Sequence, residues 1–91
     1  MTADFLDLVT HGGQVEFSLY EIEVPKDSPI GSKTLAEADI RGTTGATVLA
    51  IRKADGTFNL QLTSSSQIEN GDILVVLGTP DQIARFEQLN R

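Results

Sequence analysis

The stretch NGDILVVLGTPDQIARFEQL, residues 70–89, contains the clearest structural signals of the chain. Its apolar run Ile73 to Leu77 has the length and composition of a buried strand. Residues 79–82 (Thr-Pro-Asp-Gln) then supply a helix cap, a proline at the first helical position, an early acid and a capping Gln. The predicted helix turns one apolar face towards a sheet, and that face consists of Ile83, Phe86 and Leu89.

A second strand pair is predicted upstream of this unit. Residues 46–52 form a nearly unbroken apolar run, which indicates a strand covered on both faces. Asp55-Gly56 is a tight-turn pair, and beyond it Phe58, Leu60 and Leu62 alternate with polar residues. We therefore expect a hairpin over residues 47–62 whose second arm is half-exposed.

The segment before this hairpin indicates a strand, a loop and a short helix. In the predicted strand, residues 15–24, the apolar side chains change from odd to even positions at Leu19-Tyr20, which indicates either a bulge or burial on both faces, and we favour the bulge. Two prolines make residues 25–31 a loop. Thr34 and Glu37 form a capping box for a helix that Gly42 can end.

Residues 2–13 are predicted to form a short helix with Thr2 as its cap and Gly12 at its close. The predicted element order is α-β-α-β-β-β-α, which is a single small α+β domain on a mainly antiparallel sheet with flanking short helices. A lead-in of one helix from Met1 suggests a chain cut from a longer protein.

Composition narrows the classes of function. The chain has 91 residues with 7 basic and 13 acidic side chains, a formal net charge of -6 and no cysteine. Nucleic-acid and anionic-membrane binding need clustered cations, so we expect neither. No apolar run is long enough to span a bilayer, and direct membrane insertion is not expected. The core of so short a chain is small, which favours dimerisation, and the absence of cysteine fits a reducing compartment.

Few residues indicate catalysis or metal binding. His11 could bind a metal with Asp4 or Asp7, but a solvated histidine at a helix end is the favoured interpretation. Glu21 and Glu23 share one face of a strand, where carboxylates usually serve solubility. We find no nucleophile-base pair, metal cluster or cofactor loop, so we expect no catalytic residues, no metal site and no enzyme.

Arg41 is the most informative polar residue. It lies beside Ile40 and the hydroxyl residues Thr43, Thr44 and Thr47, so its guanidinium could bind a phosphate or carboxylate by paired hydrogen bonds. The alternative is an exposed arginine that complements a helix end. The segment 42–45 (Gly-Thr-Thr-Gly) leads into a strand, whereas phosphate-binding loops lead into a helix, so we interpret it as a turn.

Several segments taken in order resemble the RCK C-terminal, or TrkA-C, domain. They are Asp4-Phe-Leu-Asp-Leu, Ser28-Pro-Ile-Gly-Ser-Lys-Thr-Leu-Ala-Glu37, Ile40-Arg41, Gly45-Ala-Thr-Val-Leu-Ala-Ile-Arg52 and Asn70-Gly-Asp-Ile-Leu-Val-Val-Leu-Gly78. The resemblance covers almost the whole chain. It implies a linker helix from an upstream lobe over residues 1–13 and the domain itself over residues 14–91.

The resemblance implies regulation. Such domains pair as homodimers and sit in cytoplasmic parts of potassium channels, uptake systems and cation antiporters, at the inner face of the membrane and beside an RCK N-terminal lobe. Some family members bind cyclic di-AMP and others sense divalent cations. The family's cyclic di-AMP site resembles the region that holds Ile40, Arg41, Thr47 and Val48, although Thr47 stands where the family pattern has an Asn.

Two hypotheses follow from the resemblance. In the first, the chain is an effector-binding and dimerisation domain that gates ion flux allosterically, with Arg41 as the anion contact. In the second, it is a purely structural dimerisation module without a small-molecule ligand.

Overall fold

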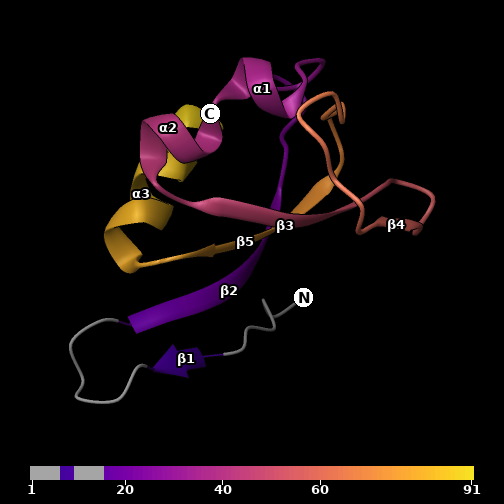
Figure 1. Cartoon of the computed structure of the whole chain (residues 1–91). Helices are drawn as coiled ribbons and strands as arrows, with labels where there is room; N and C mark the ends of the chain where they lie inside the picture. Colours follow the sequence, from indigo (N-terminus) through magenta and orange to yellow (C-terminus); the bar gives the residue numbers. More distant parts are fainter. Residues whose placement is uncertain (1–6, 10–15) are drawn as a thin grey trace.

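A five-stranded sheet forms the centre of the chain in the computed structural model, which describes residues 7–9 and 16–91 (Figure 1). The strands occur in the order β1-β2-β5-β3-β4 and every neighbouring pair is antiparallel. In chain order the elements are β1 (Asp7–Val9), β2 (Glu16–Glu23), α1 (Leu35–Ala38), α2 (Ile40–Thr44), β3 (Thr47–Arg52), β4 (Phe58–Asn59), β5 (Ile73–Gly78) and α3 (Pro80–Leu89). This confirms the predicted α+β fold with an antiparallel sheet and short flanking helices.

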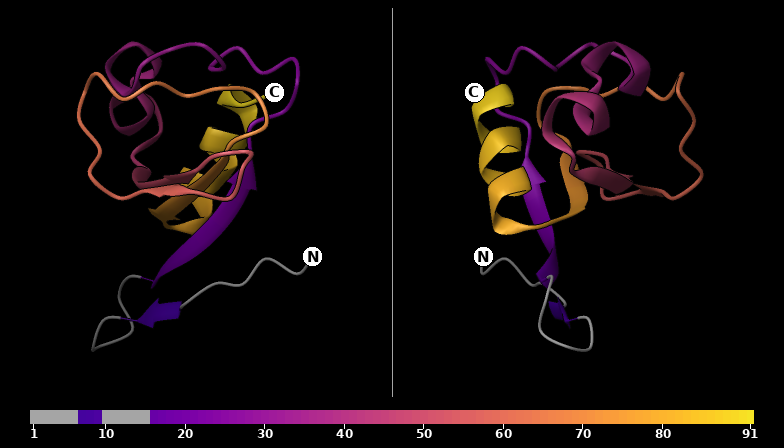
Figure 2. Two further views of the ribbon diagram at one scale, coloured as in Figure 1. Left: turned by 90° about the vertical axis from the view of Figure 1, so that its right-hand side faces the viewer. Right: turned by 60° about the vertical axis from the view of Figure 1, so that its left-hand side comes forward.

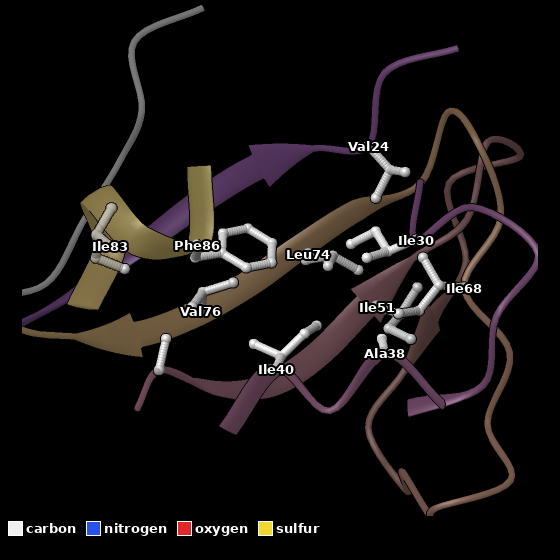
Figure 3. Packing of buried hydrophobic residues seen from close by; sticks show 11 residues of the cluster. Val24, Ile30, Ala38, Ile40, Ile51, Ile68, Leu74, Val76, Ile83 and Phe86 are labelled. Atoms are coloured by element: carbon white, nitrogen blue, oxygen red, sulfur yellow. The ribbon is translucent and has the colours of Figure 1, made fainter. Parts of the chain in front are cut away.

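The core lies between the sheet and the helices. β5 is the central strand, and its residues Leu74 and Val76 are both 0% exposed. Phe86 of α3 is also 0% exposed and lies beside Val76 (Figure 3), as its position in the predicted helix face indicated. Figures 1 and 2 show α2 and α3 on the same side of the strands, so one face of the sheet carries the helices. The remaining buried apolar residues of this cluster are Val24, Ile30, Ala38, Ile40, Ala46, Ile51, Ile68 and Ile83.

β2 and β3 pair with β5 in different ways. The register between β2 and β5 runs without a shift from Ser18 to Glu23, so the bulge predicted at Leu19-Tyr20 is wrong. Residues 17–22 are all half-buried, so neither face of β2 is fully buried within one chain. The bulge lies instead in β3 between Val48 and Ala50, and it leaves Leu49 43% exposed, so β3 is not fully covered as expected.

The N-terminal helix prediction is wrong where it can be tested. Asp7–Val9 is a strand that pairs with residues 16–18 of β2, while the rest of the predicted helix, residues 2–6 and 10–13, lies outside the described residues. A helix of about three turns is marginal by itself in water, whereas the edge of an existing sheet offers backbone partners at once. Its assignment as a linker from an upstream lobe stays a prediction.

The hairpin after β3 is shorter than predicted. Its second arm, β4, has only two residues, and Leu60 beyond it is 72% exposed. Leu62, the last apolar residue of the predicted arm, is half-buried and packs against the core from a loop. The turn at Asp55-Gly56 forms as predicted, with the Thr57 amide and hydroxyl donating to the Asp55 carboxylate.

Candidate functional site

A groove of about 400 Å³ lies between the two short helices, the start of β3 and the loop that follows β4. All four residues of the predicted site line it, and they come from both sides of the bend between α2 and β3. The complete lining is Leu35, Ala36, Ile40, Arg41, Ala46, Thr47, Val48, Leu62, Thr63 and Ser64. The wall is therefore mostly apolar and contains a single charged side chain, that of Arg41.

The bend that carries Arg41 begins at the capping box predicted for α1. The Thr34 hydroxyl accepts from the Glu37 amide at 3.1 Å, and the Glu37 carboxylate accepts from the Thr34 amide at 2.9 Å. α1 ends after one turn because Asp39 adopts a left-handed conformation with φ 47°. α2 then starts in a new direction and places Arg41 in its last turn, exposed to solvent.

α2 ends at Thr44 with Gly45 as its C-cap, and the prediction that Gly42 ends a helix is wrong. Gly45 has φ 83°, which closes α2 in the left-handed conformation, whereas Gly42 lies inside α2. The segment 42–45, interpreted as a turn from the sequence, therefore holds the end of a helix. A Cβ atom on Gly45 would also lie 2.8 Å from the side-chain nitrogen of Gln82, so a larger residue here would have to move the end of that side chain as well as adopt a strained backbone.

The polar groups of the groove differ in whether they already have partners. The amides of the first turn of α1 are occupied, because Leu35 donates to the Ser66 carbonyl at 2.9 Å and Ala36 to the Ser64 carbonyl at 3.0 Å. By contrast, within the described residues the side chains of Arg41, Thr47 and Ser64 make no hydrogen bond or ion pair. Arg41 and these two hydroxyls are the groups that the groove offers to an anion.

The third wall of the groove, residues 62–64, was not predicted from the sequence. Backbone bonds from α1 to the carbonyls of Ser64 and Ser66 bring this loop against the helix. Ser64 belongs to the polar run that the sequence indicated only as a loop, and no local pattern marks it as a neighbour of Arg41. The contact is a product of the tertiary fold.

Among the described residues, the other candidates from the sequence do not assemble into a second site. His11 and Asp4 lie outside the described residues. Glu21 lies 3.9 Å from the Arg52 guanidinium, so it serves an ion pair, and Arg52 also lies 6.0 Å from the ring centre of Phe58. Residues 7–9 and 16–91 contain no group of three or more metal-binding side chains.

A charged cluster away from the groove stabilises the fold. Asp72 is 2% exposed, and its Oδ2 accepts hydrogen bonds from Lys53 Nζ at 2.7 Å and from the Glu69 amide at 2.9 Å. Glu69 pairs with the same Lys53 nitrogen at 3.1 Å. Desolvation lowers the pKa of Lys53, but the hydrogen bonds to Asp72 and Glu69 outweigh it, and the pKa lies above its usual 10.5.

Comparison with known proteins finds a domain family and relatives that this chain resembles. The sequence pattern of the TrkA-C domain matches residues 19–90. A probable potassium channel protein of Methanocaldococcus jannaschii, "Probable potassium channel protein 2", is 29% identical over 85 residues, which cover 93% of this chain and 24% of that protein. The chain therefore spans about a quarter of the length of this curated relative.

Solved structures give the same architecture. The RCK_C domain dimer of S. agalactiae BusR in complex with c-di-AMP is 35% identical, has a TM-score of 0.72 and covers 78% of this chain and 92% of its own. BusR in complex with its busAB-promotor DNA is 30% identical with a TM-score of 0.72, covering 90% of this chain and 38% of its own. Within the described residues, no helix is long and apolar enough to cross a bilayer.

Proposed function

Because the chain belongs to the TrkA-C domain family, we propose that it is the effector-binding and dimerisation domain of a potassium channel or cation transporter. It acts at the cytoplasmic face of the membrane, beside an RCK N-terminal lobe, and controls ion flux without carrying out catalysis. The observation that supports effector binding is the groove, where Arg41 has no partner among the described residues and lies among apolar side chains and unpartnered hydroxyls.

The chemistry of the groove favours an anion with a planar or apolar body. Arg41 can donate paired hydrogen bonds to a phosphate or carboxylate, and Ile40 and Val48 offer apolar surface to the rest of the ligand. The lining contains no carboxylate, so a divalent cation fits this groove less well than an anion. Cyclic di-AMP has both an anionic and a planar part, and it is present in the similar BusR domain dimer.

Thr47 alters one contact relative to the family pattern. A hydroxyl offers one donor, whereas the amide of an Asn offers donors and an acceptor together. We therefore expect weaker binding of cyclic di-AMP than in a family member with Asn at this position. A Thr47→Asn variant should bind it more tightly.

Regulation follows from linkage between the ligand and a two-fold pair of chains. A ligand that binds one arrangement of the two subunits more tightly shifts their equilibrium by its difference in affinity. The neighbouring lobe passes this change to the membrane-embedded subunit, and the conformation of that subunit in turn affects ligand affinity through the same coupling free energy.

A ligand-free dimerisation module is the second candidate. Leu49, Phe58 and Leu60 are exposed apolar residues at 43%, 53% and 72%, and they could serve an interface without any bound effector. The full protein that contains this domain could also be a DNA-binding regulator, because BusR, which binds promotor DNA, contains a similar domain as part of its chain. Direct contact of this domain with DNA is not expected, because its net charge is -6.

Thermal melting with cyclic di-AMP tests the proposal. The wild-type chain and the Lys26→Ala variant should both gain thermal stability with the nucleotide, because it binds only the folded state, and Arg41→Ala should lose that gain. Lys26 is a suitable control since it is an exposed cation outside the groove. A dimer in sedimentation that shows no gain with cyclic di-AMP would favour the ligand-free module, and a gain with Mg²⁺ or Ca²⁺ alone would contradict the anion site.

A further inference from the structure

Arg85 of α3 makes a hydrogen bond to the C-terminal end of α2. Nη1 of Arg85 donates to the backbone carbonyl of Thr44, the last residue of α2, at 3.3 Å. Thr44 is 1% exposed, and its hydroxyl donates to the Ile40 carbonyl at 2.7 Å and accepts from the Ala46 amide at 3.0 Å. Arg85, Thr44 and the bend between α2 and β3 thus form one connected set of hydrogen bonds.

This connection bears directly on the groove. A five-residue helix cannot hold its conformation alone, and the carbonyls of its last turn have no partner within the helix. Gly45 supplies a donor to the Arg41 carbonyl at 2.9 Å, and Arg85 supplies the donor to Thr44 from outside the helix. Ile40 and Arg41 therefore belong to a turn whose position depends on α3.

We propose that Arg85 is a positioning residue for the groove, an inference that rests on the proposed function. Arg85 fixes the turn that carries Ile40 and Arg41, and so keeps Arg41 available to the anion. Arg85 itself does not contact the anion, since it does not line the groove. It also makes α3 part of the ligand-responsive unit.

α3 has the connections that such a role requires. At its C-terminal end, Asn90 accepts from the Ser28 hydroxyl at 2.8 Å and donates to the Glu23 carbonyl at 2.9 Å. Both Ser28 and Asn90 are buried. α3 therefore connects the turn that carries Arg41 to the C-terminal end of β2. A shift of α3 at one of these contacts changes the position of the segment bound at the other.

The test measures the affinity of the whole chain for cyclic di-AMP by isothermal titration calorimetry. Arg85→Met keeps the apolar stem but removes the donor, and we expect about three- to tenfold weaker binding from the loss of one charged hydrogen bond. Arg91→Met removes the same charge from an exposed residue without a side-chain partner among the described residues, and should change affinity less than about twofold. Arg85→Lys, which can still donate, should recover most of the affinity.

A double variant tests whether Arg85 acts through the arginine of the groove. In an Arg41→Ala background, Arg85→Met should cause no further loss of affinity. Equal losses for Arg85→Met and Arg91→Met, or a loss that persists in the Arg41→Ala background, would overturn the inference. Wild-type binding that Arg41→Ala weakens and Arg85→Met leaves unchanged would overturn only this inference. Absence of binding by the wild-type chain would overturn the proposed function and the role of Arg85 with it.

Discussion

Replacement of Asp72 by asparagine tests the buried charged cluster. The substitution keeps the shape of the side chain but removes the charge that receives hydrogen bonds from Lys53 and from the Glu69 amide. A hydrogen bond to a charged group contributes about 1.5–3 kcal/mol, against about 0.5–1.5 kcal/mol for a neutral one. The bond from the Glu69 amide loses about 1 kcal/mol of this difference, and the bond from Lys53 keeps its charged donor but loses the carboxylate charge, so the two losses together come to about 2 kcal/mol.

The remaining contacts of Lys53 reduce this cost. Its nitrogen lies 3.1 Å from Glu69 and its side chain is 30% exposed, so the cation keeps a partner and part of its hydration. We therefore expect Asp72→Asn to lower the free energy of unfolding by about 1.5 kcal/mol, and the melting temperature of a domain of this size by roughly 6–12 °C.

Urea unfolding followed by circular dichroism measures the effect, at fixed protein concentration because a dimer gains stability with concentration. Asp27→Asn is the matched control, since Asp27 is exposed and the variant has the same net charge. A loss below about 0.5 kcal/mol, or a loss equal to that of Asp27→Asn, would refute the reasoning about the local bonds.

Three further predictions concern single positions. The pKa of Lys53 in the folded state lies above 10.5, so the stabilisation by its charge is complete below pH 10.5 and is lost as pH rises through the folded-state pKa. The melting temperature should therefore fall more steeply above pH 10.5 in the wild type than in Lys53→Met. Ser32 has φ 78°, and Ser32→Gly should raise stability by about 0.5 kcal/mol in urea unfolding, whereas a decrease would contradict strain at this residue. Gly45→Ala should lower the free energy of unfolding by about 2 kcal/mol or more, because backbone strain adds to a clash with Gln82. Gly56→Ala, with φ 92° and open space around it, should lower it by the strain alone. Equal melting temperatures of the two variants would exclude the clash.

Signals within one or two turns of chain were sufficient to predict the start of α1, the C-terminal helix α3 and the central strand. Thr34 and Thr79 form the capping boxes that their sequence spacing indicated, and Phe86 packs on the sheet as its position in the helix required. These features depend on neighbours a few residues away, so the sequence pattern contains most of the relevant information.

Features that depend on distant partners were predicted less well. Residues 7–9 form a strand because β2 offers them an edge, and the bulge at Leu49 follows from the register that β3 adopts against β5. The sequence neighbours of Arg41 led to the prediction of an anion contact, and the structure places Arg41 in the groove, whereas Ser64 joins the groove only when the loop after β4 docks on α1. Local patterns therefore indicated one side of the groove and not the other.

The central position of β5 has a consequence for synthesis of the protein. β5 lies between β2 and β3, although the ribosome makes it after both. Until residues 73–78 emerge, the other available partners are the three-residue β1 and the two-residue β4, which are too short to hold a sheet. Until then, β2 and β3 remain unpaired on the nascent chain, and unpaired strand edges are prone to aggregation. A premature stop before residue 73 would leave them permanently without a partner, and we expect such a fragment to be bound by chaperones or degraded.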